Sequence, residues 1–413
     1  MQQQRNQFSK SVMALVILIV IVGLRLEAAA QEHEELASEP TSDYTELSMQ
    51  VGDMLKFFGQ VGFRIEYMAN ERFAENDSTA DDNHRYRERV RLRFGGEITP
   101  SKWFTAGFRF STGHSTYPAS GWSSFSDDFR RDPVSLDRIY INLNYKQFEL
   151  RMGANANPLF RPTELVWDDD VQTAGFAEVF KPGCWELVAG QFMLAEVRSL
   201  NSPEESGSLL FAHGITYSPP LSGTLKLGIF QYFYNKPDAI AIAIAEGQLD
   251  GDFKTNRLLP DDERKFFSNY NSLGASLLWA DGTWRVISEA VVNLSARSDA
   301  SLGEGYAKKE NVGFGVLLRY GTLNKAGDWS LEGGFFHIEA DATIAAFNSD
   351  DYQQTNVNAV PVWLRVRLPG KATLVWDSYF QKRINTALFL SGGVQHNENA
   401  LKIRTRLTLQ IGF

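Results

Sequence analysis

The last thirteen residues of the chain alternate between apolar and polar side chains. In the segment LKIRTRLTLQIGF, every second position from Leu401 to Phe413 is apolar apart from one threonine, whereas Lys402, Arg404 and Arg406 lie on the other face. Successive side chains of a β-strand point to opposite faces, so the segment predicts a two-faced strand. Such a strand fits a soluble sheet with a core on one side, and it also fits a membrane barrel with lipid outside and a wet lumen inside.

The same alternation recurs in about sixteen segments from Leu55 onward, separated in turn by short and long connections. The short ones include TPSK, KPGC, ADGT and PGK, and the long ones include residues 195–208 and 235–268. Bacterial outer-membrane barrels have even strand numbers, short periplasmic turns and long external loops. We therefore predict an all-β fold, a transmembrane antiparallel β-barrel over residues 55–413 with both termini periplasmic. The expected lipid-facing residues include Phe57, Val61, Phe63, Ile65, Tyr67, Val90, Leu92, Phe94, Ile98, Val312, Phe314, Val316, Leu318 and Tyr320.

The composition is compatible with a barrel. The mean hydropathy of -0.26 resembles that of a soluble protein, but only alternate barrel residues face lipid, which keeps this average low. The single cysteine, Cys184, excludes an internal disulfide framework. The formal charge of -9 is opposite to the basic excess that is typical of nucleic-acid-binding proteins, and we expect no nucleic-acid partner.

The N-terminus has the pattern of an export signal. Arg5 and Lys10 precede an apolar run from Val12 to Leu24, and small residues follow up to Ala30. This run is shorter than the roughly 20 residues of a spanning helix, so we predict a signal peptide over residues 1–30. Residues 31–54 are acidic and poor in large apolar side chains, which indicates a periplasmic N-terminal segment.

Basic residues gather on one predicted wall. The segment RYRERVRLRF carries five arginines at a period of two, from Arg85 to Arg93, and a strand places all of them on one face. Closure of a barrel brings the first and last strands together, so basic residues of both chain ends become neighbours. The predicted pore-lining set is Arg64, Arg89, Arg91, Arg93, Arg109, Arg365, Arg367, Lys402, Arg404 and Arg406. The alternative is that acids such as Glu66 and Glu97 cancel these charges in scaffold ion pairs.

An acidic loop follows the fifth predicted strand. It contains Glu164, Asp168, Asp169 and Asp170, and its position resembles that of the third external loop of sixteen-stranded general porins, which folds inward and narrows the channel. By that resemblance these acids form a constriction that faces the basic wall, and opposed charges in a narrow passage create a strong transverse field. A Ca²⁺ site and a solvated external loop remain alternatives. Similar pairs, expected to hold cations that bridge lipopolysaccharide, are Asp127 with Asp128, Asp261 with Asp262, and Asp350 with Asp351.

Two further features stay open. The run AIAIAIA, from Ala239 to Ala245, is apolar on both strand faces and fits a loop helix, a strand inside the lumen or an extension above the rim. A barrel hydrolase would need a positioned histidine, for which His84 and His114 are the nearest candidates. Neither histidine belongs to a spaced motif, so we predict no enzyme.

The segment from Leu136 to Phe176, LDRIYINLNYKQFELRMGANANPLFRPTELVWDDDVQTAGF, resembles the bacterial putative porins. The matching positions are Asp137, Tyr140, Asn157, Pro158, Trp167, Asp168, Asp170 and Gly175, and residues 91–113 resemble the second and third strands of the same family. A Gly-Lys pair is common before Asn-Pro in that family, whereas this chain has Gly153 and Ala154, so no role of that lysine transfers. The resemblance implies an outer-membrane channel without a cofactor, and porins often form trimers, which makes a homotrimer the expected assembly.

The final strand resembles the signal that the barrel insertion machinery recognises, here Leu407, Leu409, Ile411 and Phe413. The expected partners are therefore this machinery, outer-membrane lipid, lipopolysaccharide, and small hydrophilic solutes or ions that diffuse passively through a water-filled lumen. A dominant arginine wall would favour anions, and dominant loop acids would favour cations. The alternatives are a non-conducting structural or adhesive barrel that acts through its external loops, and a barrel hydrolase.

Overall fold

The computed structural model describes residues 47–51, 54–70, 84–113, 120–125, 133–195, 207–246, 255–352, 354–387, 389–390, 394–395 and 401–412. The predicted signal peptide, most of the acidic N-terminal segment and Phe413 lie outside these residues.

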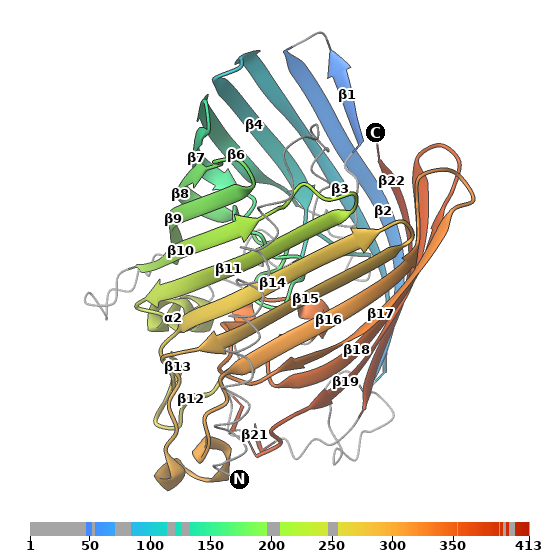
Figure 1. Ribbon diagram of the computed structural model, residues 1–413. Helices are drawn as coiled ribbons and strands as arrows, with labels where there is room; N and C mark the ends of the chain where they lie inside the picture. The colour runs from blue at the N-terminus through green and yellow to red at the C-terminus, as the bar shows by residue number, and fades with distance from the viewer. Residues whose placement is uncertain are drawn as a thin grey trace.

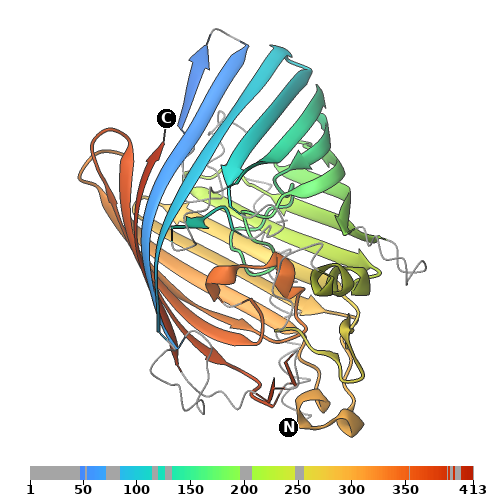
Figure 2. The ribbon, with the colours of Figure 1, turned by 180° about the vertical axis from the view of Figure 1, so that it is seen from behind.

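Sixteen antiparallel strands close into a barrel, as the sequence predicts (Figures 1 and 2). Closure occurs because β22 pairs with β19 on one side and with β2 on the other, so that Leu409 lies in register with both Leu374 and Phe63. The barrel strands are β2 (Leu55–Ala69), β3 (His84–Ser101), β4 (Phe104–Thr112), β6 (Val134–Tyr145), β7 (Phe148–Asn155), β8 (Thr173–Phe180), β9 (Trp185–Ala195), β10 (Ser208–Tyr217), β11 (Thr224–Asn235), β14 (Asn271–Asp281), β15 (Trp284–Asn293), β16 (Val312–Gly321), β17 (Trp329–Ile338), β18 (Val357–Arg367), β19 (Ala372–Arg383) and β22 (Lys402–Gly412).

Short elements complete the fold. β1 (Leu47–Val51) pairs with the start of β2, and β5 (Ser123–Ser124) pairs with β3 beyond the end of β4. The remaining elements belong to connections: α2 (Asp238–Ala245), β12 (Leu258–Leu259), β13 (Asp262–Phe266), η4 (Ala300–Leu302), η5 (Glu304–Tyr306), η6 (Ala345–Phe347), η7 (Asp350–Tyr352), β20 (Phe389–Leu390) and β21 (Val394–Gln395).

The outer face carries the apolar set of the alternating pattern. Phe63 and Leu318, for example, are 50% and 48% exposed, whereas their chain neighbours on the inner face are buried. Aromatic side chains concentrate beside the short turns, where Phe148 stacks on Phe180 with ring centroids 4.4 Å apart. An outward apolar band with an aromatic girdle is typical of transmembrane barrels. No helix in the described part of the chain is long and apolar enough to cross a membrane.

The long-loop half of the barrel interior is filled by a hydrophobic core. The described residues of three connections lie inside the barrel, namely 156–172, 236–246 with 255–270, and 339–352 with 354–356, and their apolar side chains pack on the inner faces of β9 to β11 and β16 to β19. Trp167 lies between Tyr232 and Phe347, with ring centroids at 5.9 and 5.0 Å. The run from Ala239 to Ala245 lies in helix α2, and most of its residues are buried in this core. The inner face of the barrel is therefore polar along β22, β2 and β3, whereas it is rich in aromatic side chains on the far side of the barrel, along β9 to β11.

Candidate functional site

The predicted basic residues form one continuous inner wall. Strand pairing sets Arg64 in register with Arg89 on one side and Thr408 on the other, and the next inward row joins Glu66, Arg87 and Arg406. Because the side-chain period of a strand is two, the arginine runs of β3 and β22 stay on the lumen side along their length. The arginine wall, as we name it, comprises Arg64, Arg89, Arg91, Arg93, Arg109, Arg365, Arg404 and Arg406, all of them buried among lumen contacts.

The first inward loop, residues 156–172, binds the wall through one of its four predicted acids. Asp170 pairs with Arg93, lies 4.0 Å from Arg91 and accepts a hydrogen bond of 3.1 Å from the backbone N–H of Gly121. Burial alone would raise the pKa of Asp170, but Arg93 and Arg91 outweigh it and hold that pKa below its ordinary value. Asp170 thus anchors the loop to the wall.

The other acids of this loop do not touch the wall. Asp169 pairs with Arg161 of the same loop at 2.8 Å, and Asp168 accepts a hydrogen bond of 2.6 Å from the backbone of Asp170. Burial, reinforced by the charge of Asp169, raises the pKa of Glu164 to about 8. Burial and the neighbouring Glu164 also raise the pKa of Asp168. At neutral pH the loop therefore carries less negative charge than its sequence indicates.

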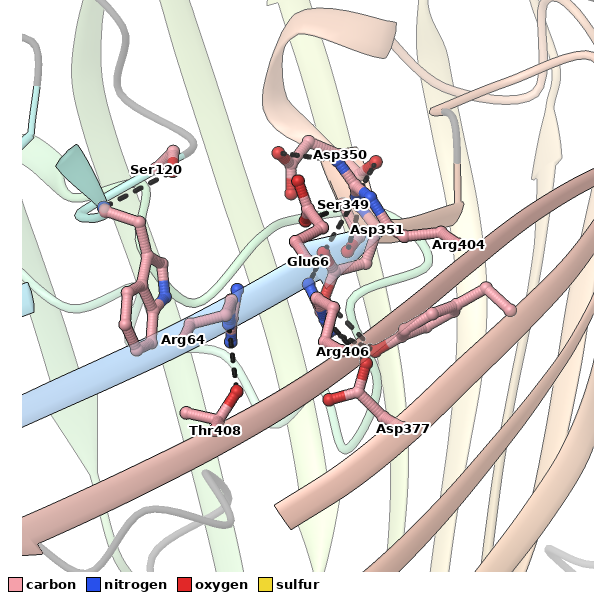
Figure 3. Close-up of polar contacts among 12 residues, drawn as sticks. Arg64, Glu66, Ser120, Ser349, Asp350, Asp351, Asp377, Arg404, Arg406 and Thr408 are labelled. Carbon is pink, nitrogen blue, oxygen red and sulfur yellow. Dashed lines mark hydrogen bonds and ion pairs between the residues drawn. The ribbon is translucent and has the colours of Figure 1, made fainter. Parts of the chain in front are cut away.

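A second inward loop, residues 339–356, binds the wall at the barrel seam (Figure 3). The carboxylate of Asp351 accepts hydrogen bonds from Arg406, including one of 2.7 Å, and from Arg404 at 3.1 Å. The hydroxyl of Tyr379 donates to the same carboxylate at 3.1 Å. Arg404 also donates to the backbone oxygen of Asp350 at 3.0 Å. The expectation that Asp350 and Asp351 seal the membrane from outside is wrong, because both residues lie inside the barrel.

The two inward loops hold each other. The hydroxyl of Ser349 donates to Glu164 at 2.8 Å, and the backbone N–H of Asp168 donates to the carbonyl of Phe347 at 2.7 Å. The second loop is anchored further out by Arg257, whose fully buried guanidinium pairs with the equally buried Asp341 at 2.8 Å. Loop position is therefore set by these contacts as well as by the wall.

Trp122 forms the third contact with the wall. Its indole lies 3.9 Å from the Arg64 guanidinium and 4.6 Å from that of Arg91, and Arg89 donates to its backbone oxygen at 2.9 Å. A Cβ at Gly62 would lie 2.7 Å from the indole, so only glycine leaves room for this ring. We call the site formed by Gly62, Arg64 and Arg91 around this indole the Trp122 socket. No sequence signal singles out Trp122, because the socket forms only when β2 and β3 are paired.

Several wall arginines have acidic partners within the barrel. Arg109 makes three hydrogen bonds to Asp137, the shortest of 2.7 Å, and Arg406 also bonds Asp377 at 2.5 Å. Buried Glu66 lies 3.3 Å from Arg404. The scaffold interpretation thus describes part of the wall, but a cavity of about 510 Å³ still opens between the wall and the two inward loops.

The remaining predicted residues lie apart from this cavity. Lys402 is buried at the start of β22, and Arg367 donates to Thr373 at 3.1 Å near the short turn that joins β18 and β19. Leu407 and Ile411 face outward, 44% and 38% exposed, with Leu409 on the same face. His84 lies 3.1 Å from the Tyr67 hydroxyl on the outer face, while His114 is outside the described residues. No group of three potential metal ligands comes together in the part of the chain that the structure describes.

Comparison with known families decides the identity. A family model described as "Putative porin" matches residues 25–236, which is more than half of the chain. The chain belongs to this porin family. The match includes the segment whose motifs resemble the bacterial putative porins, and membership together with the fold makes the protein a porin-like barrel channel.

One solved structure supports this fold, and a second shows a weaker likeness. The high-pH structure of OprB from Pseudomonas putida gives a TM-score of 0.52 at 10% sequence identity, over 86% of this chain and 94% of that chain. A mutant of the porin from Rh. blastica gives a TM-score of 0.46 at 8% identity, over 86% of this chain and 100% of that chain. At such identities the likeness to OprB concerns the fold alone. A search of curated proteins returns no match.

Proposed function

We propose that this porin lets small hydrophilic solutes and ions diffuse passively across the outer membrane, along the arginine wall, and that it prefers anions. The observation that carries the proposal is the cavity of about 510 Å³ between the wall and the two inward loops. The rest of the long-loop half is packed with aromatic side chains, so a solute on this route passes beside guanidinium groups. Porin family membership supports a channel, and no covalent chemistry is required of it.

The charge balance of the cavity supports the anion preference. Among the described residues that line it, ten are arginine or lysine and seven are aspartate or glutamate. The pKa of about 8 leaves Glu164 mostly protonated at neutral pH, and burial shifts the pKa of Asp168 in the same direction, which increases the excess of positive charge. Rings and walls of fixed charge select ions of opposite sign in narrow pores. We therefore assign the selectivity to the wall rather than to the loop acids.

The wider setting belongs to the same proposal. Residues 1–30 would be removed as a signal peptide, residues 31–54 would form a periplasmic segment, and both termini of the barrel chain would lie on the periplasmic side. Phe413 with Leu407, Leu409 and Ile411 would address the chain to the barrel insertion machinery. We further propose contacts with lipopolysaccharide and assembly as a homotrimer, which porin family membership supports.

The test is electrical. The mature protein is refolded into a planar bilayer, and its single-channel conductance and reversal potential are measured under a salt gradient. We expect stable conductance steps and a reversal potential of the sign that reports anion preference. Folded, inserted protein without conductance would contradict the open channel, and a reversal potential of the opposite sign would contradict the role of the wall.

A pair of variants separates the wall from the general charge of the protein. Arg365→Gln removes a charge that lines the cavity, whereas Lys382→Gln removes one from the exposed end of β19. Anion preference should fall in the first variant and stay unchanged in the second.

A further inference from the structure

The arginine wall already binds carboxylates of the chain itself, and two of them come from the inward loops. Asp170 sits on Arg93 and Arg91 of β3, and Asp351 sits on Arg404 and Arg406 of β22. Guanidinium groups bind carboxylates through charge-assisted, often paired hydrogen bonds. The two aspartates therefore show which kind of ligand the donors of this wall accept.

Arg64 lies on β2, between the strands β3 and β22 that hold these two aspartates. None of the described carboxylates is bound to it. Its Nε donates to Thr408 at 3.0 Å and its guanidinium stacks on Trp122, but none of the described acidic residues forms an ion pair with it. Asp351 and Asp377 interact with its charge only from a distance. Its terminal nitrogens make no hydrogen bond to any described residue, and they are not sealed from the cavity that Arg64 lines.

The guanidinium of Arg64 is oriented by Thr408 and Trp122 before any ligand binds. Stacking on an aromatic ring uses the face of the guanidinium plane and leaves its N–H groups available at the edge. Thr408 fixes the Nε edge, and Arg89 fixes the segment of Trp122 through hydrogen bonds to Ser120 and to the Trp122 backbone. A donor group that is ordered before binding loses less conformational entropy when the ligand arrives.

We propose that Arg64 is an affinity site for the carboxylate of a small organic anion in transit, an inference that rests on the proposed channel function. The terminal nitrogens of Arg64 would receive the carboxylate oxygens, while Trp122 keeps the guanidinium oriented. The carboxylates that neighbouring arginines of the wall already bind, Asp170 on Arg93 and Asp351 on Arg406, are singly charged and planar. This favours a singly charged carboxylate over a doubly charged phosphate.

The test measures binding directly and does not require conductance. Acetate labelled with ¹³C at its carboxyl is titrated with the folded barrel in a neutral detergent, and the broadening of its ¹³C resonance reports weak binding. We expect saturable broadening that excess unlabelled acetate removes. Arg64→Lys keeps the charge but loses the planar fork, and it should weaken acetate binding about tenfold or more.

The control is Arg151→Lys on β7, an inward arginine whose guanidinium is held by Glu149 at 2.8 Å and which does not line the cavity. This variant should bind acetate like the wild type. Equal binding by wild type and Arg64→Lys would overturn the site, as would equal losses in both variants. Inorganic phosphate that displaces the label more effectively than acetate would overturn the preference for carboxylate.

The bilayer experiment separates this inference from the proposed function. Conductance by a wild-type barrel that does not bind acetate refutes the affinity site alone. Acetate binding that depends on Arg64, in a folded barrel that does not conduct, refutes the channel and retains the site.

Discussion

The substitution Asp351→Asn should release the second inward loop from the barrel seam. Asp351 is the one residue of this loop whose carboxylate binds Arg404, Arg406 and Tyr379 together. Asparagine keeps the size of the side chain and one acceptor oxygen but removes the charge. The change therefore tests the ion pairs with little change in packing.

The magnitude follows from what remains after the substitution. Loss of one partner of a buried ion pair costs about 3–5 kcal/mol when the other charge is left unpaired. Here Arg406 keeps its ion pair with Asp377 at 2.5 Å and Arg404 keeps its ion pair with Glu66 at 3.3 Å. Each arginine therefore retains an acidic partner. The loss is closer to that of one or two hydrogen bonds to charged groups, about 3 kcal/mol in total. Local opening of the loop should then become more frequent by roughly a hundredfold.

Hydrogen exchange of the amides in residues 344–351 is the direct assay. The N–H of Ser349 donates to the carbonyl of Glu164 at 3.2 Å and loses this partner when the loop leaves the first inward loop. The matched control is Asp350→Asn, because the Asp350 carboxylate lies 4.0 Å from Arg404. Burial and the charge of Asp351 raise the pKa of Asp350, so neutralising it costs little.

The two variants remove the same charge from adjacent positions of one loop. Faster exchange and larger single-channel conductance are expected for Asp351→Asn alone. If both variants exchange at the same rate, the loop is not held by its ion pairs at the seam, and the calculation above is wrong.

Three further predictions concern the two inward loops and the Trp122 socket. Because the folded pKa of Glu164 is about 8 against an ordinary 4.5, its contribution to loop stability is complete below the ordinary pKa and is lost as pH rises through about 8; Glu164→Gln should remove this loss in hydrogen exchange measured on both sides of that pKa. Gly62→Leu should displace Trp122 at a cost of about 1–3 kcal/mol, seen as a change in tryptophan fluorescence on unfolding the barrel. Arg257→Met should lower local loop stability by about 3–5 kcal/mol in hydrogen exchange, whereas the same change at exposed Arg264 should have no effect.

The strands were predictable because their signal is local. A strand that faces lipid needs an apolar side chain at every second position, and this requirement leaves its pattern in β3 and β22 whatever the rest of the chain does. The short turns and long loops then give the strand order, and pairing of the first strand with the last follows from the need to satisfy every backbone group in hydrocarbon. The basic wall could be predicted for the same reason, since it depends only on strand period and closure.

The inward loops depend on contacts that no local pattern records. Asp350 and Asp351 resemble the acidic pairs of other loops, and their contacts with β22 are set by the fold of residues 339–349 and by the seam. One signal for the aromatic core was present, however. In β11, Phe230 is buried on the inner face and Phe233 is exposed on the outer face, so this strand is apolar inside as well as outside. A strand that is apolar on both faces indicates a packed interior rather than a wet one.

The same arginines attract solutes and hold the loops, which affects how selectivity can be measured. A substitution of Arg93 removes a charge that lines the cavity and also releases Asp170, and a substitution of Arg406 removes a charge of the wall and also releases Asp351, so a change in conductance would have two causes. Arg64 is different because no carboxylate of the described loop residues pairs with it. We therefore expect Arg64→Lys to change acetate binding without changing loop exchange, whereas Arg406→Lys should change both. Faster loop exchange in Arg64→Lys would show that the wall acts as one unit, and that solute binding and loop anchoring cannot be separated residue by residue.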